Sequence, residues 1–249
     1  MGQDELKCLR GGEDASANRS AGALYHARTF VMADTPVTTQ RYISEACEED
    51  LLRYGDSFRG AGYTKSPEEA AQRYALMLAV IREVDEPVTV LDFGCGLAHL
   101  LDYIARDPRH RHVRYTGLDL SPKYLQAARA RHPEGMFVLL DVLESDKALP
   151  DFDYVIMNGV FNFRGQVAEQ SMLQYWQQLV SVMFKHCRRG LAFNVMSTLV
   201  DWQRDDLFHL SFDAMAEHVG QALSRHFVVR HDYGAFEYTT YVYRSPSAQ

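Results

Sequence analysis

Short apolar runs alternate with longer stretches of helical hydrophobic spacing from residue 88 onward. Nearly continuous apolar runs are typical of strands that are buried on both faces of a parallel sheet. Strands and helices that alternate in this way favour a doubly wound sheet with right-handed crossovers. We therefore predict an α/β, Rossmann-like fold whose mostly parallel, seven-stranded sheet uses residues 88–93, 113–118, 136–140, 152–157, 191–196, 227–230 and 238–243.

Helix signals fill the intervals between these runs. Ser66-Pro67 and Ser121-Pro122 each place an N-cap residue before a proline at the first helical position, and Glu69 completes a capping box for the first of them. Apolar residues at helical spacing follow both signals. The predicted helices are residues 66–81, 97–106, 121–132, 169–187 and 212–224.

The last two predicted strands are joined by the turn-like sequence HDYGAFE. This arrangement predicts an antiparallel hairpin at the edge of the sheet. Tyr238 and Val242 would lie on one face and Tyr241 and Tyr243 on the other, so that one face covers helices and the other is free for solvent or a partner chain. A homodimer could form through this edge, although aromatic side chains that stack on a sugar would give the same pattern.

The region before the first predicted strand divides into segments of different composition. Residues 1–22 are polar and rich in Gly, Ser and Asp, which predicts a flexible tail. Residues 23–66 carry scattered aromatic residues, a predicted helix around 42–54 and then a Gly-rich stretch, which favours an N-terminal helical cap. Residues 67–249 would then form the main α/β domain.

Composition limits the classes of partner. The chain has 249 residues, is 47% hydrophobic, and carries 26 Lys and Arg against 33 Asp and Glu, a net charge of −7 that disfavours nucleic acid as a partner. No stretch approaches the roughly 18 apolar residues of a membrane span. The 4 cysteines lie far apart without a C-x-x-C pair, which is typical of free thiols in a reducing compartment. We therefore expect a cytoplasmic protein without a membrane partner.

Two glycines and two carboxylates stand at the ends of the first three predicted strands. Gly94 and Gly96 follow the first strand, where an open parallel sheet binds its ligands. Asp119 ends the second strand, where a carboxylate can accept the hydroxyl protons of a ribose, and Asp141 ends the third, where it could face an adenine edge. A nicotinamide dinucleotide would require a small residue in place of His99, so a nucleoside without a pyrophosphate fits better.

Four sequence segments carry a family resemblance. VLDFGCGLAHL, YTGLDLSPKYLQAAR, FVLLDVLE and FDYVIMNGVFN resemble, in order and spacing, the motifs of class I S-adenosylmethionine-dependent methyltransferases over residues 87–197, with Ala98 in place of the usual third glycine. YGDSFRGAGYTKS, LAFNVMSTLVDW, DDLFHLSFD and RHDYGAFEYTTYVYR are similar to a bacterial subgroup associated with genes for surface-polysaccharide or secondary-metabolite assembly. The resemblance implies S-adenosylmethionine as the cofactor and S-adenosylhomocysteine as its product.

The resemblance also implies roles for individual residues. Residues of the first glycine motif would line the methionine moiety, residues after the second and third strands would hold the ribose and the adenine, and residues after the fourth would lie beneath the sulfonium. An arginine before the first strand could reach the methionine carboxylate, and a tyrosine of the Gly-rich segment could cover the cofactor. These residues are, in that order, Asp92, Gly94, Cys95 and Gly96; Asp119, Leu120, Asp141 and Val142; Asn158, Gly159 and Val160; Arg73; and Tyr63.

The acceptor pocket is expected beyond the fourth and fifth strands. Phe161, Asn162 and Phe163 would line it, together with Asn194, although ordinary packing and strand-end hydrogen bonds would explain the same residues. The chain lacks the N/D-P-P-Y/F sequence that amino-methylating enzymes acting on DNA generally carry after the fourth strand.

Three histidines are candidates for a general base. His209 is the first candidate because its loop can fold over the site, His99 could orient a water near the cofactor, and His231 precedes the hairpin. No metal site is predicted, because solvated loop charges explain the nearby aspartates. These aspartates are Asp201, Asp205 and Asp206.

The sequence thus predicts methyl transfer to a hydroxyl of a small-molecule or glycan acceptor. N-methylation of an amino sugar or related metabolite is the alternative within enzymes. A non-catalytic cofactor-binding module that regulates or scaffolds a partner is the alternative from another class, and a nicotinamide oxidoreductase ranks third.

Overall fold

The computed structural model describes residues 35–57, 59–61 and 66–247. The predicted flexible tail, residues 1–22, and the predicted cofactor residue Tyr63 lie outside the described residues. All the structural statements that follow concern the described ranges.

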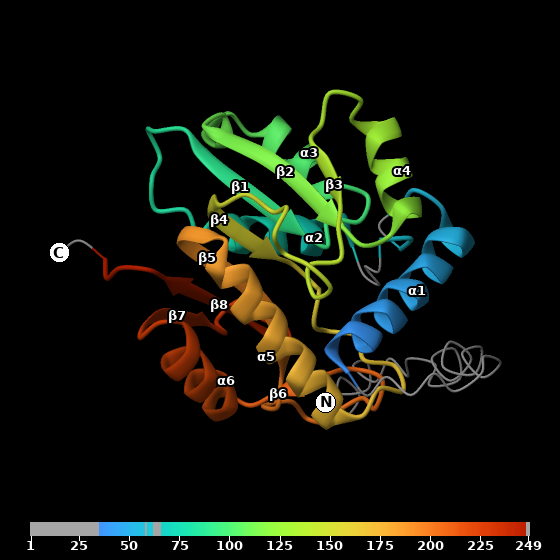
Figure 1. Cartoon of the computed structure of the whole chain (residues 1–249), viewed down its shortest axis with the longest axis vertical. Coiled ribbons are helices and arrows are strands. Elements are labelled where there is room, and N and C mark those ends of the chain that lie inside the picture. The colour runs from blue at the N-terminus through green and yellow to red at the C-terminus, as the bar shows by residue number, and fades with distance from the viewer. Residues whose placement is uncertain (1–34, 58, 62–65, 248–249) are drawn as a thin grey trace, which may run out of the picture. The chain divides into compact units, whose positions relative to one another are not determined.

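An eight-stranded sheet organises the chain, in the order β3-β2-β1-β4-β5-β8-β7 with β6 paired to β5 off this path (Figure 1). Strands β1 to β5 pair in parallel, whereas β8 pairs antiparallel with both β5 and β7. The predicted α/β fold with an antiparallel C-terminal pair is confirmed, and β6 is an eighth strand that the sequence did not predict. The strands are β1 (Val88–Phe93), β2 (Val113–Asp119), β3 (Phe137–Leu139), β4 (Phe152–Met157), β5 (Cys187–Ser197), β6 (His209–Leu210), β7 (His226–Arg230) and β8 (Glu237–Tyr243).

The predicted caps begin two of the helices. Ser66 accepts a hydrogen bond from the Glu69 amide, and Ser121 accepts one from the Tyr124 amide. No described helix is long and apolar enough to cross a membrane. The helices are α1 (Pro36–Tyr54), α2 (Pro67–Leu78), α3 (His99–Arg106), the short 3-10 helix η2 (Pro108–His110), α4 (Pro122–Arg131), α5 (Glu169–Lys185), α6 (Phe212–His218) and the π-helical turn η3 (Val219–Leu223).

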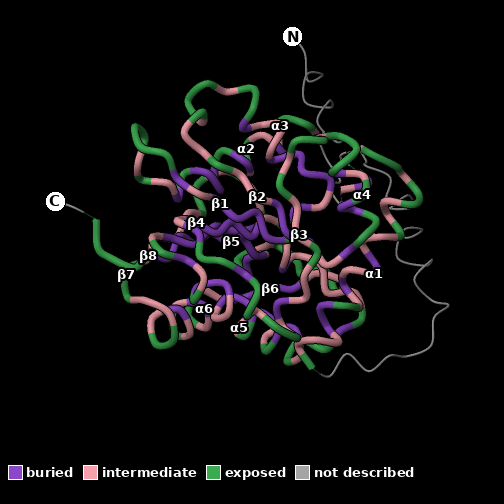
Figure 2. The backbone as a smooth tube through the Cα atoms, turned by 45° about the horizontal axis from the view of Figure 1, so that its top comes forward, coloured by how far each residue is buried: buried purple, intermediate pink, exposed green. Residues whose placement is uncertain are grey.

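Helices cover both faces of the sheet, and the buried backbone in Figure 2 follows the central strands. On one face, Tyr74 and Met77 of α2 and Leu100 of α3 pack against β1 and β4. On the other, Trp176 of α5 and Met215 of α6 pack in a second apolar cluster with β1, β4 and β5. Both faces of the central strands are therefore buried, as their continuous apolar runs predicted.

Strand β8 differs from its prediction. All of Glu237–Tyr243 is buried, so the expected face free for solvent or a partner chain does not exist on this strand. The reason is that β8 lies between β5 and β7: the Tyr241 hydroxyl donates to the Leu76 carbonyl oxygen at 2.7 Å, and Tyr238 lies in the core on the opposite face. The edge strand is β7, and homodimerisation through this edge remains a prediction.

Two element boundaries were also predicted wrongly. Helix α5 ends at Lys185 and β5 already begins at Cys187, because Arg188 and Arg189 extend the strand while pairing with Asp153.

Helix α1 begins at Pro36, earlier than the predicted start near residue 42. A reciprocal capping box between Thr35 and Thr38 fixes this start. Thr35 followed by Pro36 is a helix-start signal that the sequence already contained.

Candidate active site

The turn after β1 depends on backbone conformations that favour glycine. Gly94 and Gly96 have φ angles of 70° and 52°, and the Gly94 amide donates to the Leu118 carbonyl oxygen at 2.8 Å. A Cβ atom on Gly94 would lie 3.1 Å from a methyl carbon of Val160, so the turn also brings β1 close to the segment after β4. Ala98, with φ 58°, is the one described non-glycine residue with a positive φ, at a cost of about 1–2 kcal/mol.

A cavity opens beside this turn. Its described lining includes one carboxylate, Asp92, and no lysine or arginine. Such a lining suits a cationic or neutral ligand better than a phosphate group. The lining residues are Ala61, Tyr74, Asp92, Gly94, Cys95, Gly96, Leu97, His99, Leu100 and Asn158.

Asp92 is buried beneath the glycine turn with 4% of its surface exposed. The Tyr115 hydroxyl donates to its Oδ2 atom at 2.8 Å. Burial raises the pKa of Asp92 to about 7, and the hydrogen bond from Tyr115 only partly opposes this effect. Asp92 can therefore change its charge near neutral pH, which makes it sensitive to any cation that enters the cavity.

Asp119, at the end of β2, stabilises the same turn. Its Oδ2 accepts from the Gly96 amide and its Oδ1 from the Ser121 amide, each at 2.9 Å. Burial raises the pKa of Asp119, while the hydrogen bonds from these amides act in the opposite direction. Each carboxylate oxygen retains a further lone pair, so its predicted contact with ribose hydroxyls is compatible with these bonds. Leu120, the predicted adenine contact, follows and is half-buried.

Asp141 shapes the turn that follows β3. Its Oδ1 accepts from the amides of Leu143 and Glu144 at 3.1 and 3.2 Å. Arg41 of α1 approaches its Oδ2, with 3.5 Å between Nε and Oδ2. Val142 is buried as part of the apolar core, and its expected contact with adenine remains a prediction.

Buried amides meet at the carboxyl ends of β4 and β5. The Gly159 amide donates to Oδ1 of Asn194 at 2.7 Å, and Asn194 is fully buried. The Asn162 amide nitrogen donates to Oε2 of Glu237 at 2.9 Å. Asn158 lines the cavity described above. The predicted residues Asn158, Asn162 and Asn194 are therefore grouped at this end of the sheet.

Glu237 is a residue that the sequence analysis missed. It is 1% exposed, and Arg73 of α2 forms an ion pair with its Oε1, with 2.7 Å between Nε and Oε1. The structure thus places Arg73 on a buried carboxylate, and its expected contact with the methionine carboxylate remains a prediction. A carboxylate at the start of an aromatic strand was the only sequence signal for Glu237.

The two predicted phenylalanines of the acceptor pocket lie in the core. Phe161 is fully buried, with its ring centroid 5.7 Å from that of Tyr175 and 6.2 Å from that of Phe193. Phe163 is partly buried against the same cluster and bridges to Leu207. Packing accounts for Phe161 in this conformation, and Phe163 is the more accessible of the two.

His209 lies beside the carboxyl end of β5. Strand β6 pairs it with Met196, and its Nδ1 lies 2.7 Å from the Ser197 carbonyl oxygen. Because a carbonyl oxygen only accepts, Nδ1 must carry a proton, and in the neutral ring Nε2 holds the lone pair. Nε2 is buried and has no hydrogen-bond partner among the described residues. This geometry suits a general base.

The other two histidines have different surroundings. His99 lines the glycine-turn cavity, and its Nε2 lies 3.5 Å from Oδ1 of Asp56. Burial lowers the pKa of His99, and the positive charge of Arg131 adds to this effect. His231 is exposed and contacts the ring of Phe212.

Within residues 35–57, 59–61 and 66–247, no group of three or more His, Cys, Asp or Glu side chains could hold a metal ion. Of the loop aspartates considered above, Asp206 forms an ion pair with Arg204, with 2.5 Å between Nη2 and Oδ2.

Comparison with known proteins adds independent findings. Residues 91–190 match a family described as a methyltransferase domain. A putative methyltransferase of Mycobacterium tuberculosis is 30% identical over 159 residues, which cover 63% of this chain and 93% of that protein.

Two solved structures share the fold. The magnesium protoporphyrin IX methyltransferase of Synechocystis PCC 6803 with bound S-adenosylmethionine has a TM-score of 0.57 and 14% identity, over 87% of this chain and 100% of that one. The N-methyltransferase NodS of Bradyrhizobium japonicum with bound S-adenosylhomocysteine has a TM-score of 0.56 and 17% identity, over 82% of this chain and 98% of that one.

Proposed function

This chain belongs to the S-adenosylmethionine-dependent methyltransferases, and we propose that it methylates a hydroxyl of a small-molecule or saccharide acceptor. The similarity of several segments to a subgroup associated with surface-polysaccharide or secondary-metabolite assembly supports that acceptor class. The acceptor hydroxyl would lie at the carboxyl ends of β4 and β5.

The residues at the glycine turn fit the cofactor. Gly94 lines the glycine-turn cavity, which would be the cofactor cradle, and an added Cβ atom there would lie 3.1 Å from Val160. Asp92 gives the cavity a carboxylate, and its described lining holds no lysine or arginine. Gly94, Gly96 and Asp92 would hold the methionine moiety, and Asp119 the ribose. When bound, S-adenosylmethionine supplies a methyl group that the adjacent sulfonium makes electrophilic. The protein's main task is then to align the acceptor, which can contribute about 7–11 kcal/mol.

A matched donor and acceptor support a hydroxyl as the methylated group. Asn194 Oδ1 is held by the Gly159 amide, so its Nδ2 is a buried donor without a hydrogen-bond partner among the described residues. Asn162 Nδ2 donates to Glu237. The Oδ1 atom of Asn162 is therefore a buried acceptor that also lacks a hydrogen-bond partner among the described residues. A hydroxyl can donate to Asn162 and accept from Asn194 while one lone pair remains for attack. This pair is the observation that carries the proposal.

An amine fits the same pair less well. A neutral amine has one lone pair, which it needs for attack on the methyl group, so it cannot also accept from Asn194 Nδ2. A hydroxyl is the weaker nucleophile at neutral pH and benefits from a base. His209 Nε2 would take the hydroxyl proton in place of Asn162 Oδ1 as the new O–C bond forms and the bond between the methyl group and the sulfonium sulfur breaks.

The test is incubation with methyl-labelled S-adenosylmethionine and a panel of sugars and phenols, each paired with its amino analogue. We expect label in the hydroxyl compounds, and a loss of turnover of about 10²–10⁴-fold in His209→Ala with unchanged affinity for S-adenosylhomocysteine. His231→Ala, which removes an exposed ring, is the matched control and should keep full turnover. Near-normal turnover of His209→Ala would remove His209 as the base.

Two other outcomes of the same incubation separate the alternatives. If only the amino compounds were labelled, the chain would be an N-methyltransferase and the proposal of O-methylation would be wrong. Tight cofactor binding without transfer to any compound of the panel would favour a non-catalytic module.

A further inference from the structure

Helix α1 is fixed across the carboxyl ends of β2 and β3, beside α4 (Figure 1). Glu48 of this helix accepts from the Ser121 hydroxyl at 2.5 Å and pairs with Lys123 at 2.6 Å. The Tyr124 hydroxyl donates to the Cys47 carbonyl oxygen at 2.8 Å. These contacts hold α1 against the residues where the adenosine part of the cofactor is expected, so its inward side chains can contribute to that site.

Gln40 is one of the inward side chains of α1, with 5% of its surface exposed. Its Nε2 donates to Oδ1 of Asp141, with 3.4 Å between the two atoms. An ionised carboxylate only accepts, so this contact assigns the nitrogen of the Gln40 amide to the side that faces Asp141. The oxygen, Oε1, is therefore oriented away from Oδ1 as a fixed acceptor.

Two buried acceptor atoms remain at this place. Gln40 Oε1 and Asp141 Oδ2 both lack a hydrogen-bond partner within the described part of the chain. Arg41 Nε lies 3.5 Å from Asp141 Oδ2, but the Arg41 side chain is 48% exposed and also pairs with Glu144. A buried acceptor without a partner costs about 1–3 kcal/mol. The two atoms belong to side chains that a hydrogen bond joins, so a ligand group that donates twice would satisfy both of them.

We propose that Gln40 is a specificity-determining residue of the cofactor site, and that with Asp141 it binds the exocyclic amino group of adenine. That amino group carries two N–H donors in one plane and can satisfy both acceptors together. A carbonyl oxygen in the same position, as in hypoxanthine, would face two acceptors and leave all three oxygens unpaired. Helix α1 is thus part of the adenine site, although it lies outside the matched methyltransferase domain, residues 91–190.

Calorimetry with two ligands tests this role without an acceptor or turnover. The ligands are S-adenosylhomocysteine and S-inosylhomocysteine, which differ in the group at the purine 6-position and in the hydrogen that hypoxanthine carries on the adjacent N1. The wild-type chain should bind the adenine compound about 100-fold more tightly, because two hydrogen bonds are exchanged for repulsion. Gln40→Met, which keeps volume but loses the acceptor, should reduce this preference about tenfold.

Gln178→Met is the matched control, because Gln178 is an exposed glutamine on α5. It should keep the wild-type preference. Thermal unfolding of each variant checks that the chain is folded, and Gln40→Leu serves as the second variant if Gln40→Met is not. An unchanged preference in the folded Gln40 variant would overturn the role of Gln40 alone. If the wild-type chain bound neither ligand, both the cofactor assignment and the role of Gln40 would be wrong.

Discussion

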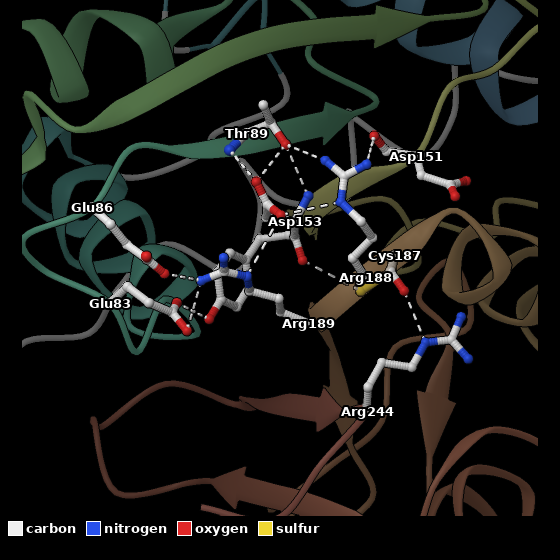
Figure 3. A network of polar contacts seen from close by, with 10 residues as sticks. Glu83, Glu86, Thr89, Asp151, Asp153, Cys187, Arg188, Arg189 and Arg244 are labelled. Carbon is white, nitrogen blue, oxygen red and sulfur yellow. Dashed lines mark hydrogen bonds and ion pairs between the residues drawn. The ribbon is translucent and has the colours of Figure 1, made fainter.

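The network around Asp153 at the amino ends of β1, β4 and β5 differs from a group of buried polar atoms at the carboxyl ends, although ring nitrogens of His112 and His186 at the amino ends also lack a hydrogen bond within the described residues. At the amino ends, Oδ2 of Asp153 accepts from both the amide and the hydroxyl of Thr89, each at 2.8 Å. Arg188 and Arg189 approach its Oδ1 at 3.2 and 3.5 Å (Figure 3). Glu83 and Glu86 in turn pair with Arg189. Every charged group in this network has a partner.

At the carboxyl ends, several buried polar atoms make no hydrogen bond within the described residues, although Asp141 Oδ2 lies 3.5 Å from Nε of the half-exposed Arg41. Asn194 Nδ2, Asn162 Oδ1, Gln40 Oε1 and Asp141 Oδ2 all lack a hydrogen bond within the described residues. Each costs about 1–3 kcal/mol if nothing binds to it. The comparison indicates that the amino ends stabilise the sheet, whereas the carboxyl ends keep hydrogen-bonding capacity for ligands at the expense of stability.

The largest expected effect is a loss of ligand affinity at the carboxyl ends that exceeds the accompanying loss of stability. Gly94→Ala places a Cβ atom 3.1 Å from Val160, at a φ of 70°, on a residue that lines the cofactor cradle. We expect affinity for S-adenosylhomocysteine to fall about 100-fold, or about 2.7 kcal/mol, by calorimetry. The free energy of unfolding should fall by only about 1–2 kcal/mol in urea titration.

Gly234→Ala is the matched control for Gly94→Ala. Gly234 has a φ of 74° and no atom within 4 Å of an added Cβ. It carries the same backbone strain away from the cradle, so stability should fall similarly while affinity stays at the wild-type value. Equal affinity losses in both variants would show that strain alone, and not the cradle, explains the result.

The next effect concerns the amino ends. Asp153→Ala removes the acceptor of the Thr89 amide and the partner of Arg188, and should lower the free energy of unfolding by about 2–3 kcal/mol in urea titration. Affinity for S-adenosylhomocysteine should not change, because none of these residues lines the glycine-turn cavity. Asp232→Ala, which removes a carboxylate from an exposed ion pair with Arg230, is the control and should leave stability unchanged. A loss of affinity in Asp153→Ala would contradict the division between the two ends.

The sequence alone was sufficient to place those residues of the candidate site that directly follow a strand. Gly94, Gly96 and Asp119 could be placed because a buried apolar run fixes where a parallel strand ends, and parallel strands bring these ends to one edge. The caps at Ser66 and Ser121 were predicted for a similar reason, since a cap depends on residues within one helical turn.

The rest of the site depends on pairs that are distant in sequence. Gln40 is 101 residues from Asp141, and Arg73 is 164 residues from Glu237. Neither the hydrophobic pattern nor a local motif indicates which element packs on which across such distances. For the same reason the prediction left one face of β8 exposed, because its burial depends on the insertion of that strand between β5 and β7.

The smallest expected effect over a single pH unit is a pH dependence of opposite sign at the two ends. The pKa of Asp92 is raised from 3.8 to about 7, so the native chain keeps this proton where the unfolded chain has lost it. Between about pH 4 and 7 the native state binds more protons, and stability falls as pH rises, by at most about 1.4 kcal/mol per pH unit. Asp92→Asn should lose this slope in urea titrations at pH 5, 6 and 7, while Asn still accepts from Tyr115.

At the amino ends the sign is reversed. Burial alone would raise the pKa of Asp153, but hydrogen bonds from Thr89 and Arg188 outweigh it and lower the pKa below 3.8. The stability from Asp153 is therefore complete above about pH 4 and lost only as the pH falls further. Asp153→Ala should thus lower stability by the same amount at pH 5 and at pH 7, whereas the difference between Asp92→Asn and the wild type should grow with pH over this range. Parallel pH profiles for Asp92→Asn and the wild type would show that Asp92 is already ionised in the folded chain, and the contrast between the two ends would then rest on hydrogen bonding alone.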